Sequence, residues 1–181
     1  MPEPESSWSQ AVVLRDGTSV TIRPIRPDDA PRLQALVGRL SPQSVFQRFL
    51  GCNKALTDEE AAHLATVDYE ARMALVATSG DNDECILGVA RYESPAGAPG
   101  QAEFAVVVED RYQGLGLGKA LLRHLVAYAR AHGLHTFVGA VRIENVRLLR
   151  FLERCGLEVQ IVGCDQGIVD IRIELREPLF R

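Results

Sequence analysis

The chain has 181 residues, enough for one domain with a substantial core, and 46% of its residues are hydrophobic. Its formal net charge of -4 argues against a general nucleic-acid-binding protein, because such proteins carry a basic surface. The four cysteines are widely spaced and the four histidines form no ligand spacing, so the sequence predicts neither a disulfide framework nor a metal site.

The N-terminus and the apolar pattern indicate a soluble protein. Residues 1–10 are rich in Pro, Glu and Ser and have little apolar surface to bury, so we expect a mobile tail. They lack the layout of a signal peptide, and no apolar run in the chain is long enough to cross a membrane. We therefore expect a cytoplasmic protein in which residues 11–181 form a single domain.

The N-terminal third is predicted to contain a hairpin and three helices. β-branched runs at 11–14 and 19–25 flank an Asp-Gly turn, which is typical of a hairpin. Apolar residues at helical spacing follow in 33–40. Ser41, which precedes a proline, and Thr57, which precedes a glutamate by three residues, are capping patterns that open two further helices.

The remaining chain alternates strands with helices. A glycine-rich turn and an amphipathic helix stand at its centre, and that helix ends at Gly133. This order predicts an α/β or α+β domain. The predicted strands are 73–78, 85–92, 102–108, 136–141, 158–162 and 168–175, and a further helix is predicted at 144–154.

The segment from Gln113 to Gly118 lies between a strand and a helix, where free backbone N–H groups and the positive helix end attract phosphate. A glycine-rich turn without any ligand remains an alternative. The segment does not match the phosphate loop of nucleotide hydrolases, because Ala120 stands where that motif needs Ser or Thr. It also fails the dinucleotide fingerprint, because Lys119 occupies the third glycine position.

Two segments of the chain resemble cofactor-binding motifs of one superfamily. Gln113, Gly116 and Gly118 satisfy the pattern Gln/Arg-x-x-Gly-x-Gly/Ala, which resembles the coenzyme A turn of the GNAT superfamily of N-acetyltransferases. Asn145, with Gly156 downstream, is similar to the second cofactor segment of that superfamily. The segments 17–49, 67–76 and 102–106 look like the acetyltransferase domain of Pat-type bacterial protein lysine acetyltransferases.

The resemblance implies a central mixed, mostly antiparallel sheet flanked by helices, with acetyl-coenzyme A as co-substrate and no metal. The strand at 102–108 is expected to separate from the strand at 136–141, and the pantetheine arm to fill the gap. Asn145 would contact the cofactor, although its position alone suits a plain helix cap equally well. The expected cofactor-binding residues are Val106, Val107, Val108, Gln113, Gly114, Leu115, Gly116, Leu117, Gly118, Lys119 and Asn145.

Glu103 aligns with the strand carboxylate that serves as general base in the Pat-type enzymes. A lysine amine has an ordinary pKa of about 10.4, so at neutral pH a base must remove a proton before the nitrogen can attack. From the strand pattern alone, Glu103 is better explained as the polar member of an alternating strand. Many GNAT enzymes place a tyrosine acid where this chain has Leu152; Tyr112 and Tyr69 are candidate substitutes, although a structural role explains each more simply.

The resemblance implies an enzyme that moves an acetyl group from acetyl-coenzyme A to a primary amine by direct attack. A protein lysine side chain is the preferred acceptor. Two alternatives stay open: a small amine as acceptor, and a non-catalytic acyl-coenzyme A sensor, which the leucine at 152 favours slightly. The expected partners are thus acetyl-coenzyme A and an acceptor protein or small amine, without nucleic acid or membrane, in a monomer or dimer.

Overall fold

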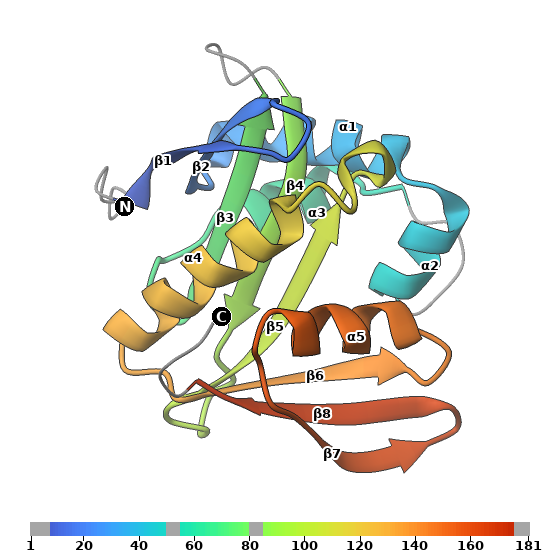
Figure 1. Ribbon diagram of the computed structural model, residues 1–181. Coiled ribbons are helices and arrows are strands. Elements are labelled where there is room, and N and C mark those ends of the chain that lie inside the picture. The colour runs from blue at the N-terminus through green and yellow to red at the C-terminus, as the bar shows by residue number, and fades with distance from the viewer. Residues whose placement is uncertain (1–7, 50–54, 80–84, 176–181) are drawn as a thin grey trace.

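The computed structural model describes residues 8–49, 55–79 and 85–175. One sheet of eight strands runs through this part of the chain in the order β1-β2-β3-β4-β5-β6-β8-β7 (Figure 1). Neighbouring strands are antiparallel except β5 and β6, which are parallel. The predicted mixed, mostly antiparallel architecture is confirmed. The strands are β1 (Gln10–Val13), β2 (Ser19–Pro24), β3 (Arg72–Ser79), β4 (Cys85–Glu93), β5 (Gln101–Val108), β6 (Thr136–Arg142), β7 (Val159–Asp165) and β8 (Ile168–Glu174).

Helices cover both faces of the sheet (Figure 1). On one face α1 packs against β4, and α3 packs against α1. On the other face α4 crosses β3, β4 and β5, while α5 lies against the C-terminal half of the sheet. Within the described ranges, no helix is both long enough and apolar enough to cross a membrane. The helices are α1 (Ala30–Arg39), α2 (Pro42–Phe49), α3 (Asp58–Ala65), α4 (Leu117–Ala131) and α5 (Val146–Arg154), with short 3-10 helices η2 (Pro27–Asp29) and η3 (Asp110–Tyr112).

Local sequence determines where three helices begin. The Ser41 hydroxyl accepts a hydrogen bond from the Ser44 amide (3.2 Å) in the first turn of α2, and Thr57 forms the predicted capping box of α3. Both predicted helix starts are confirmed. The helix expected from residue 144 begins instead at Val146, because Asn145 occupies the N-cap.

Most of the expected tail, residues 1–10, lies outside the described residues. Its last three residues are described. Trp8 packs edge-to-face on Tyr128, with 4.8 Å between ring centroids, and Gln10 pairs with Ile22 at the start of β1. Trp8 therefore contacts α4 and Gln10 belongs to the sheet, and the exact domain boundaries stay a prediction.

The sheet opens between β5 and β6. Parallel pairing joins Gln101–Glu103 to Thr136–Val138, after which β5 continues along β4 and β6 continues along β8 (Figure 1). Phe104 stacks on Phe137 with 5.3 Å between ring centroids, just where the strands part. Past this point the edge of β5 that faces β6 has no sheet partner in the described part of the chain, and the separation expected from the resemblance is present.

Candidate active site

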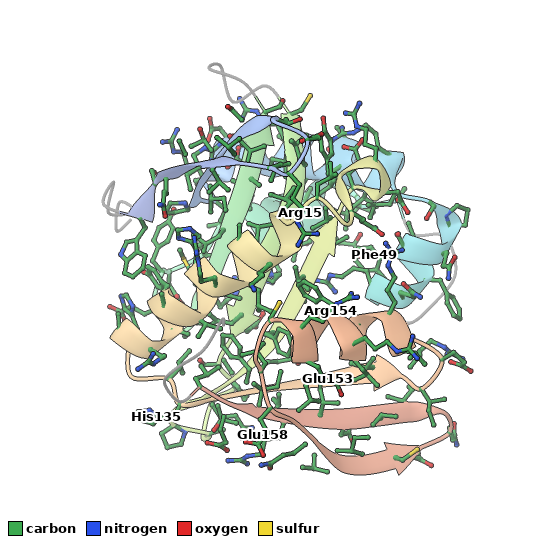
Figure 2. All side chains as sticks on the ribbon, in the orientation of Figure 1. Arg15, Phe49, His135, Glu153, Arg154 and Glu158 are labelled. Atoms are coloured by element: carbon green, nitrogen blue, oxygen red, sulfur yellow. The ribbon has the colours of Figure 1, made fainter. Side chains whose placement is uncertain are left out.

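A pocket of about 850 Å³ fills the opening between β5 and β6. Most of its walls come from the β5 edge, β6, the glycine-rich turn, α5 and α2, and Arg15 and Ile171 add to them from the β1–β2 turn and from β8. In Figure 2, Arg15, Phe49 and Arg154 lie around the region between α2, the start of α4 and α5, and all three line the pocket.

The pocket gathers most of the residues predicted to bind cofactor. Two predicted residues do not line it: the Leu117 side chain is fully buried in the core, and Leu115 packs against the core half-buried. Only a backbone role is open to these two. The predicted residues that line the pocket are Val106, Val107, Val108, Gln113, Gly114, Gly116, Gly118, Lys119 and Asn145.

The turn before α4 needs glycine at two positions. Gly114 has φ of +80° and Gly116 has φ of +99°, a left-handed conformation that other residues adopt at a cost. Gly116 is the N-cap of α4, so the first amides of the helix follow it directly. Because the first-turn amides of a helix have no intrahelical acceptor, this end of α4 attracts an anion.

Arg15, from the turn between β1 and β2, holds the glycine-rich turn from outside. Its amide donates to the Leu115 carbonyl (3.1 Å) and its guanidinium donates to the Gly114 carbonyl (3.3 Å). These bonds engage two carbonyl oxygens that would otherwise repel a phosphate. Arg15 also lines the pocket. Sequence reasoning missed it, because no local pattern links positions 99 residues apart.

Gln113 and Gly118 fix the turn against its neighbours. The Gln113 side-chain amide donates to the Val108 carbonyl (2.9 Å), which joins the turn to the end of β5. A Cβ on Gly118 would lie 3.3 Å from the Phe151 ring and 3.6 Å from the Val108 side chain. The glycine therefore lets α4 approach α5 and β5 closely at the pocket.

Asn145 has the cap role that its position suggested. Its side-chain oxygen accepts a hydrogen bond from the Leu148 amide (3.1 Å), and the residue is buried. It also lines the pocket, together with Leu148 and Phe151 from the next turns of α5. The cap and a cofactor contact are thus compatible.

The pocket is basic although the whole chain has a formal net charge of -4. Among the described residues that line it, Glu103 is the one carboxylate. Positive charge is therefore concentrated here, which suits a ligand with several negative charges. The lining cations are Arg15, Arg48, Lys119, Arg147 and Arg154.

Glu103 is the last residue of β5 that pairs with β6, opposite Val138, and the pocket opens beyond it. It lies opposite Glu93 on β4, so both carboxylates are on the same face of the sheet. Arg48 reaches this face from α2: burial lowers the pKa of its guanidinium, and the charge of Glu103 opposes that fall. Burial and then the like charge of Arg48 lower the pKa of nearby Arg91 to about 10.

No tyrosine lines the pocket; all four lie in the described part of the chain. Leu152, at the position of the usual tyrosine acid, is fully buried in the core. The Tyr69 hydroxyl donates to the Ile25 carbonyl (2.9 Å), so a structural bond occupies it. Tyr112 packs against the Arg111 guanidinium, 4.8 Å from the ring centroid. Neither candidate substitute is therefore placed to protonate a leaving thiolate.

Comparison with known proteins identifies the family. The profile described as "Acetyltransferase (GNAT) domain" matches residues 19–158, which run from β2 to the end of α5 and include the glycine-rich turn. The chain belongs to the GNAT acetyltransferase family. The fold and the family predicted from the sequence are both confirmed.

This GNAT domain is similar to several named acetyltransferases. It is 40% identical over 121 residues to Acetyltransferase PA5475 of Pseudomonas aeruginosa, covering 66% of this chain and 64% of that protein. It is 28% identical over 164 residues to Acetyltransferase Pat of Mycolicibacterium smegmatis, covering 91% of this chain and 48% of that protein. The chain thus spans less than two thirds of each relative.

A solved structure, the GNAT domain of S. lividans PAT, has nearly the same fold. The two chains share 30% sequence identity and superpose with a TM-score of 0.86. The match covers 95% of this chain and 99% of the S. lividans domain.

Proposed function

We propose that the chain is an acetyl-coenzyme A-dependent N-acetyltransferase that acetylates a primary amine, with a protein lysine side chain as acceptor. The observation that carries the proposal is the opening between β5 and β6. The opening exposes the edge of β5 that faces β6. The anion-attracting turn lies at one end of this edge, and at the other end lies Glu103, the last residue of β5 that pairs with β6.

The cofactor end of the pocket suits coenzyme A. The glycine-rich turn and the surrounding cations would hold the pyrophosphate, and Arg15 neutralises charge beside the turn. The pantetheine arm contains two amides, which would bond to the unpaired edge of β5 at Val106 and Val108 as an added strand does. The volume of about 850 Å³ is in the range of cofactor sites.

Glu103 would act as the general base. An acceptor ammonium with an ordinary pKa of about 10.4 loses its proton at a cost of roughly 4 to 5 kcal/mol near pH 7, and the carboxylate accepts that proton. The free amine attacks the thioester carbonyl carbon, whose oxygen a backbone N–H of β5 polarises. The carbon–sulfur bond then breaks, which leaves the acetylated amine and the coenzyme A thiolate.

The leaving thiolate needs no tyrosine acid in this scheme. A thiol with a pKa of about 8.5 is a fair leaving group near neutral pH. An ammonium acceptor gives up two protons when its nitrogen becomes an amide. Glu103 takes the first, which is then released to solvent, and the second passes to the sulfur directly or through water, so protons balance over the turnover. This account agrees with a buried Leu152 and with the absence of any tyrosine among the described pocket residues.

A protein lysine is preferred as acceptor for three reasons. Relatives with close overall similarity carry the name Pat, a type that the sequence also resembles. Glu103 is exposed, so a lysine side chain on another protein can reach it from solvent. A long aliphatic stem with an ammonium tip suits a pocket whose β5 wall is apolar and whose carboxylate stands at the rim.

Substitution of Glu103 tests the catalytic assignment. Glu103→Gln should lower kcat by about a hundredfold or more at neutral pH, because the amide cannot accept the proton, while the Kd for coenzyme A stays within about twofold. Glu93→Gln is the matched control: it neutralises the opposite carboxylate, which does not line the pocket, and should leave kcat within about threefold. Steady-state thiol release and calorimetry measure both quantities. Equal kcat values for Glu103→Gln and wild type would remove Glu103 from the mechanism.

A further inference from the structure

The wall of the pocket opposite α5 is the short helix α2, which supplies Ser44, Gln47, Arg48 and Phe49. Figure 1 shows α2 standing apart from the helices that cover the sheet. Among the described elements, the main packing partner of α2 is β5. Its position therefore depends on the bonds at its first turn as well as on packing.

Asp110, in η3, holds that first turn. Its carboxylate accepts hydrogen bonds from the Ser41 amide (2.9 Å), the Ser41 hydroxyl (2.7 Å) and the Ser44 hydroxyl (2.8 Å). A carboxylate facing the N-terminus of a helix is also favoured by the helix dipole. Burial alone would raise the pKa of Asp110, but the bonds from Ser41 and Ser44 lower it below its ordinary value.

The same network reaches the glycine-rich turn. The Gln113 side chain donates to the Ser44 hydroxyl (3.3 Å) and to the Val108 carbonyl (2.9 Å), and Gln113 is the residue before Gly114. Asp110 and Gln113 lie three residues apart, bridged by a backbone bond from the Gln113 amide to the Asp110 carbonyl (3.2 Å). One continuous set of bonds thus connects α2 with the turn.

The base of this network is fixed to the sheet. Glu109 is buried, and its carboxylate accepts from the Arg39 guanidinium (2.9 Å) at the end of α1. Arg39 also donates to the Ile86 carbonyl of β4 (2.7 Å). Because two residues separate α1 from α2, the corner between the helices is held in place. The corner between α1 and α2 is therefore anchored to the sheet, beside the bonds that Asp110 makes to the first turn of α2.

We infer that Asp110 is a positioning residue that couples the cofactor turn to the acceptor side of the pocket. When coenzyme A engages the turn, Gln113 and Asp110 fix the first turn of α2, and α2 then holds Arg48 against Glu103. The inference rests on the proposed function only in that coenzyme A binds at the turn; it does not depend on which amine is the acceptor.

Hydrogen–deuterium exchange with and without coenzyme A tests the coupling. In the wild-type protein, coenzyme A should slow amide exchange in the turn, 114–119, and also in α2, 45–49. In Asp110→Ala the turn should still be slowed by coenzyme A, while the effect on α2 is lost. Asp110→Asn, which keeps one acceptor oxygen, should be intermediate.

Thr57→Ala is the matched control, because it removes a helix cap from α3, a helix that contributes no residue to the pocket. In Thr57→Ala, coenzyme A should still slow amide exchange both in the turn and in α2. Slowing at the turn without any slowing in α2 of the wild type would overturn the coupling and leave the proposed function standing. Absence of slowing at both places would contradict coenzyme A binding itself, and the coupling with it.

Kinetics give a second readout. Asp110→Ala should raise the acceptor KM by about fivefold, the size expected from losing a helix cap, with the coenzyme A Kd within about twofold. A merely structural role would lower the active fraction and reduce kcat without changing the acceptor KM. That second pattern would overturn the assignment.

Discussion

At the scale of single residues, Arg15 has the clearest consequence for cofactor binding. Arg15→Ala removes one charge and one hydrogen bond to the Gly114 carbonyl, an exposed interaction of about 1 kcal/mol. The Kd for coenzyme A should therefore rise by about fivefold, with Arg15→Lys in between. Calorimetry measures this. Arg150 is an exposed cation of α5 that does not line the pocket, so Arg150→Ala should leave the Kd for coenzyme A unchanged. Equal effects of Arg15→Ala and Arg150→Ala on the Kd would contradict a specific role of Arg15.

Gly116 makes a residue-scale prediction about stability. Its φ of +99° is left-handed, so Gly116→Ala should cost about 1–2 kcal/mol and lower the Tm by about 2–8 °C. Gly38→Ala should instead stabilise the protein, because Gly38 lies inside α1 and a Cβ there meets nothing within 4 Å. It should raise the Tm by about 1–4 °C. Calorimetric melting checks both signs.

The residues of the site were only partly predictable from sequence. Gln113 to Gly118 could be predicted because glycines and a helix start form a local pattern. Arg15 and Arg48 could not, since each reaches the pocket through tertiary structure and looks like an ordinary surface cation in the sequence. Glu103 lies at the pocket as expected, and its role as base stays a prediction.

At the scale of elements, one buried ion pair joins β2 to the start of α1. The Arg23 guanidinium contacts both oxygens of Asp29, at 2.8 and 2.9 Å, and the two residues are 3% and 0% exposed. Asp29→Asn removes the carboxylate charge that faces the buried Arg23 guanidinium, so the free energy of unfolding should fall by about 3 kcal/mol. The neighbouring Asp28 side chain is 72% exposed, so Asp28→Asn should change the free energy of unfolding by less than about 0.5 kcal/mol. Urea unfolding measures both.

The same pair predicts a pH dependence. Burial alone would raise the pKa of Asp29, but bonds from Arg23 and the Arg26 amide, with the charge of Arg32, lower it below its ordinary value of 3.8. Stability from the ionised carboxylate is therefore present above about pH 4 and is lost as the pH falls through the lower folded value. The difference in unfolding free energy between wild type and Asp29→Asn should narrow below pH 4. A constant difference would show that ionisation of Asp29 contributes nothing.

Element positions were predicted well where caps and turns are local. Thr57 and the Asp-Gly turn between β1 and β2 marked their elements correctly. The start of α5 was predicted two residues early, because Asn145 caps the helix from a turn that also contains Ile143 and Glu144. Sequence patterns do not distinguish such a turn from a first helical turn.

At the scale of the whole molecule, the order of strands and helices was enough to predict an α/β or α+β domain. The mixed, mostly antiparallel sheet and the separation of β5 from β6, which forms the pocket, came only from the family resemblance. The short parallel contact between these two strands was not predicted. Pairing register between strands that are far apart in sequence depends on contacts that no single segment contains. The place of α2 beside the turn was unpredicted for the same reason, since Ser44 and Asp110 lie 66 positions apart.

We propose that this molecule transfers acetyl from acetyl-coenzyme A to lysine side chains of proteins. Thiol release from acetyl-coenzyme A, measured in parallel with lysine-bearing proteins and with a panel of small amines, tests it most directly. We expect thiol release with a protein acceptor, accompanied on each modified lysine by the mass increase of one acetyl group in place of one hydrogen atom. Thiol release with small amines alone would contradict the proposed acceptor, and tight binding of acetyl-coenzyme A without release to any acceptor would contradict the proposed enzyme.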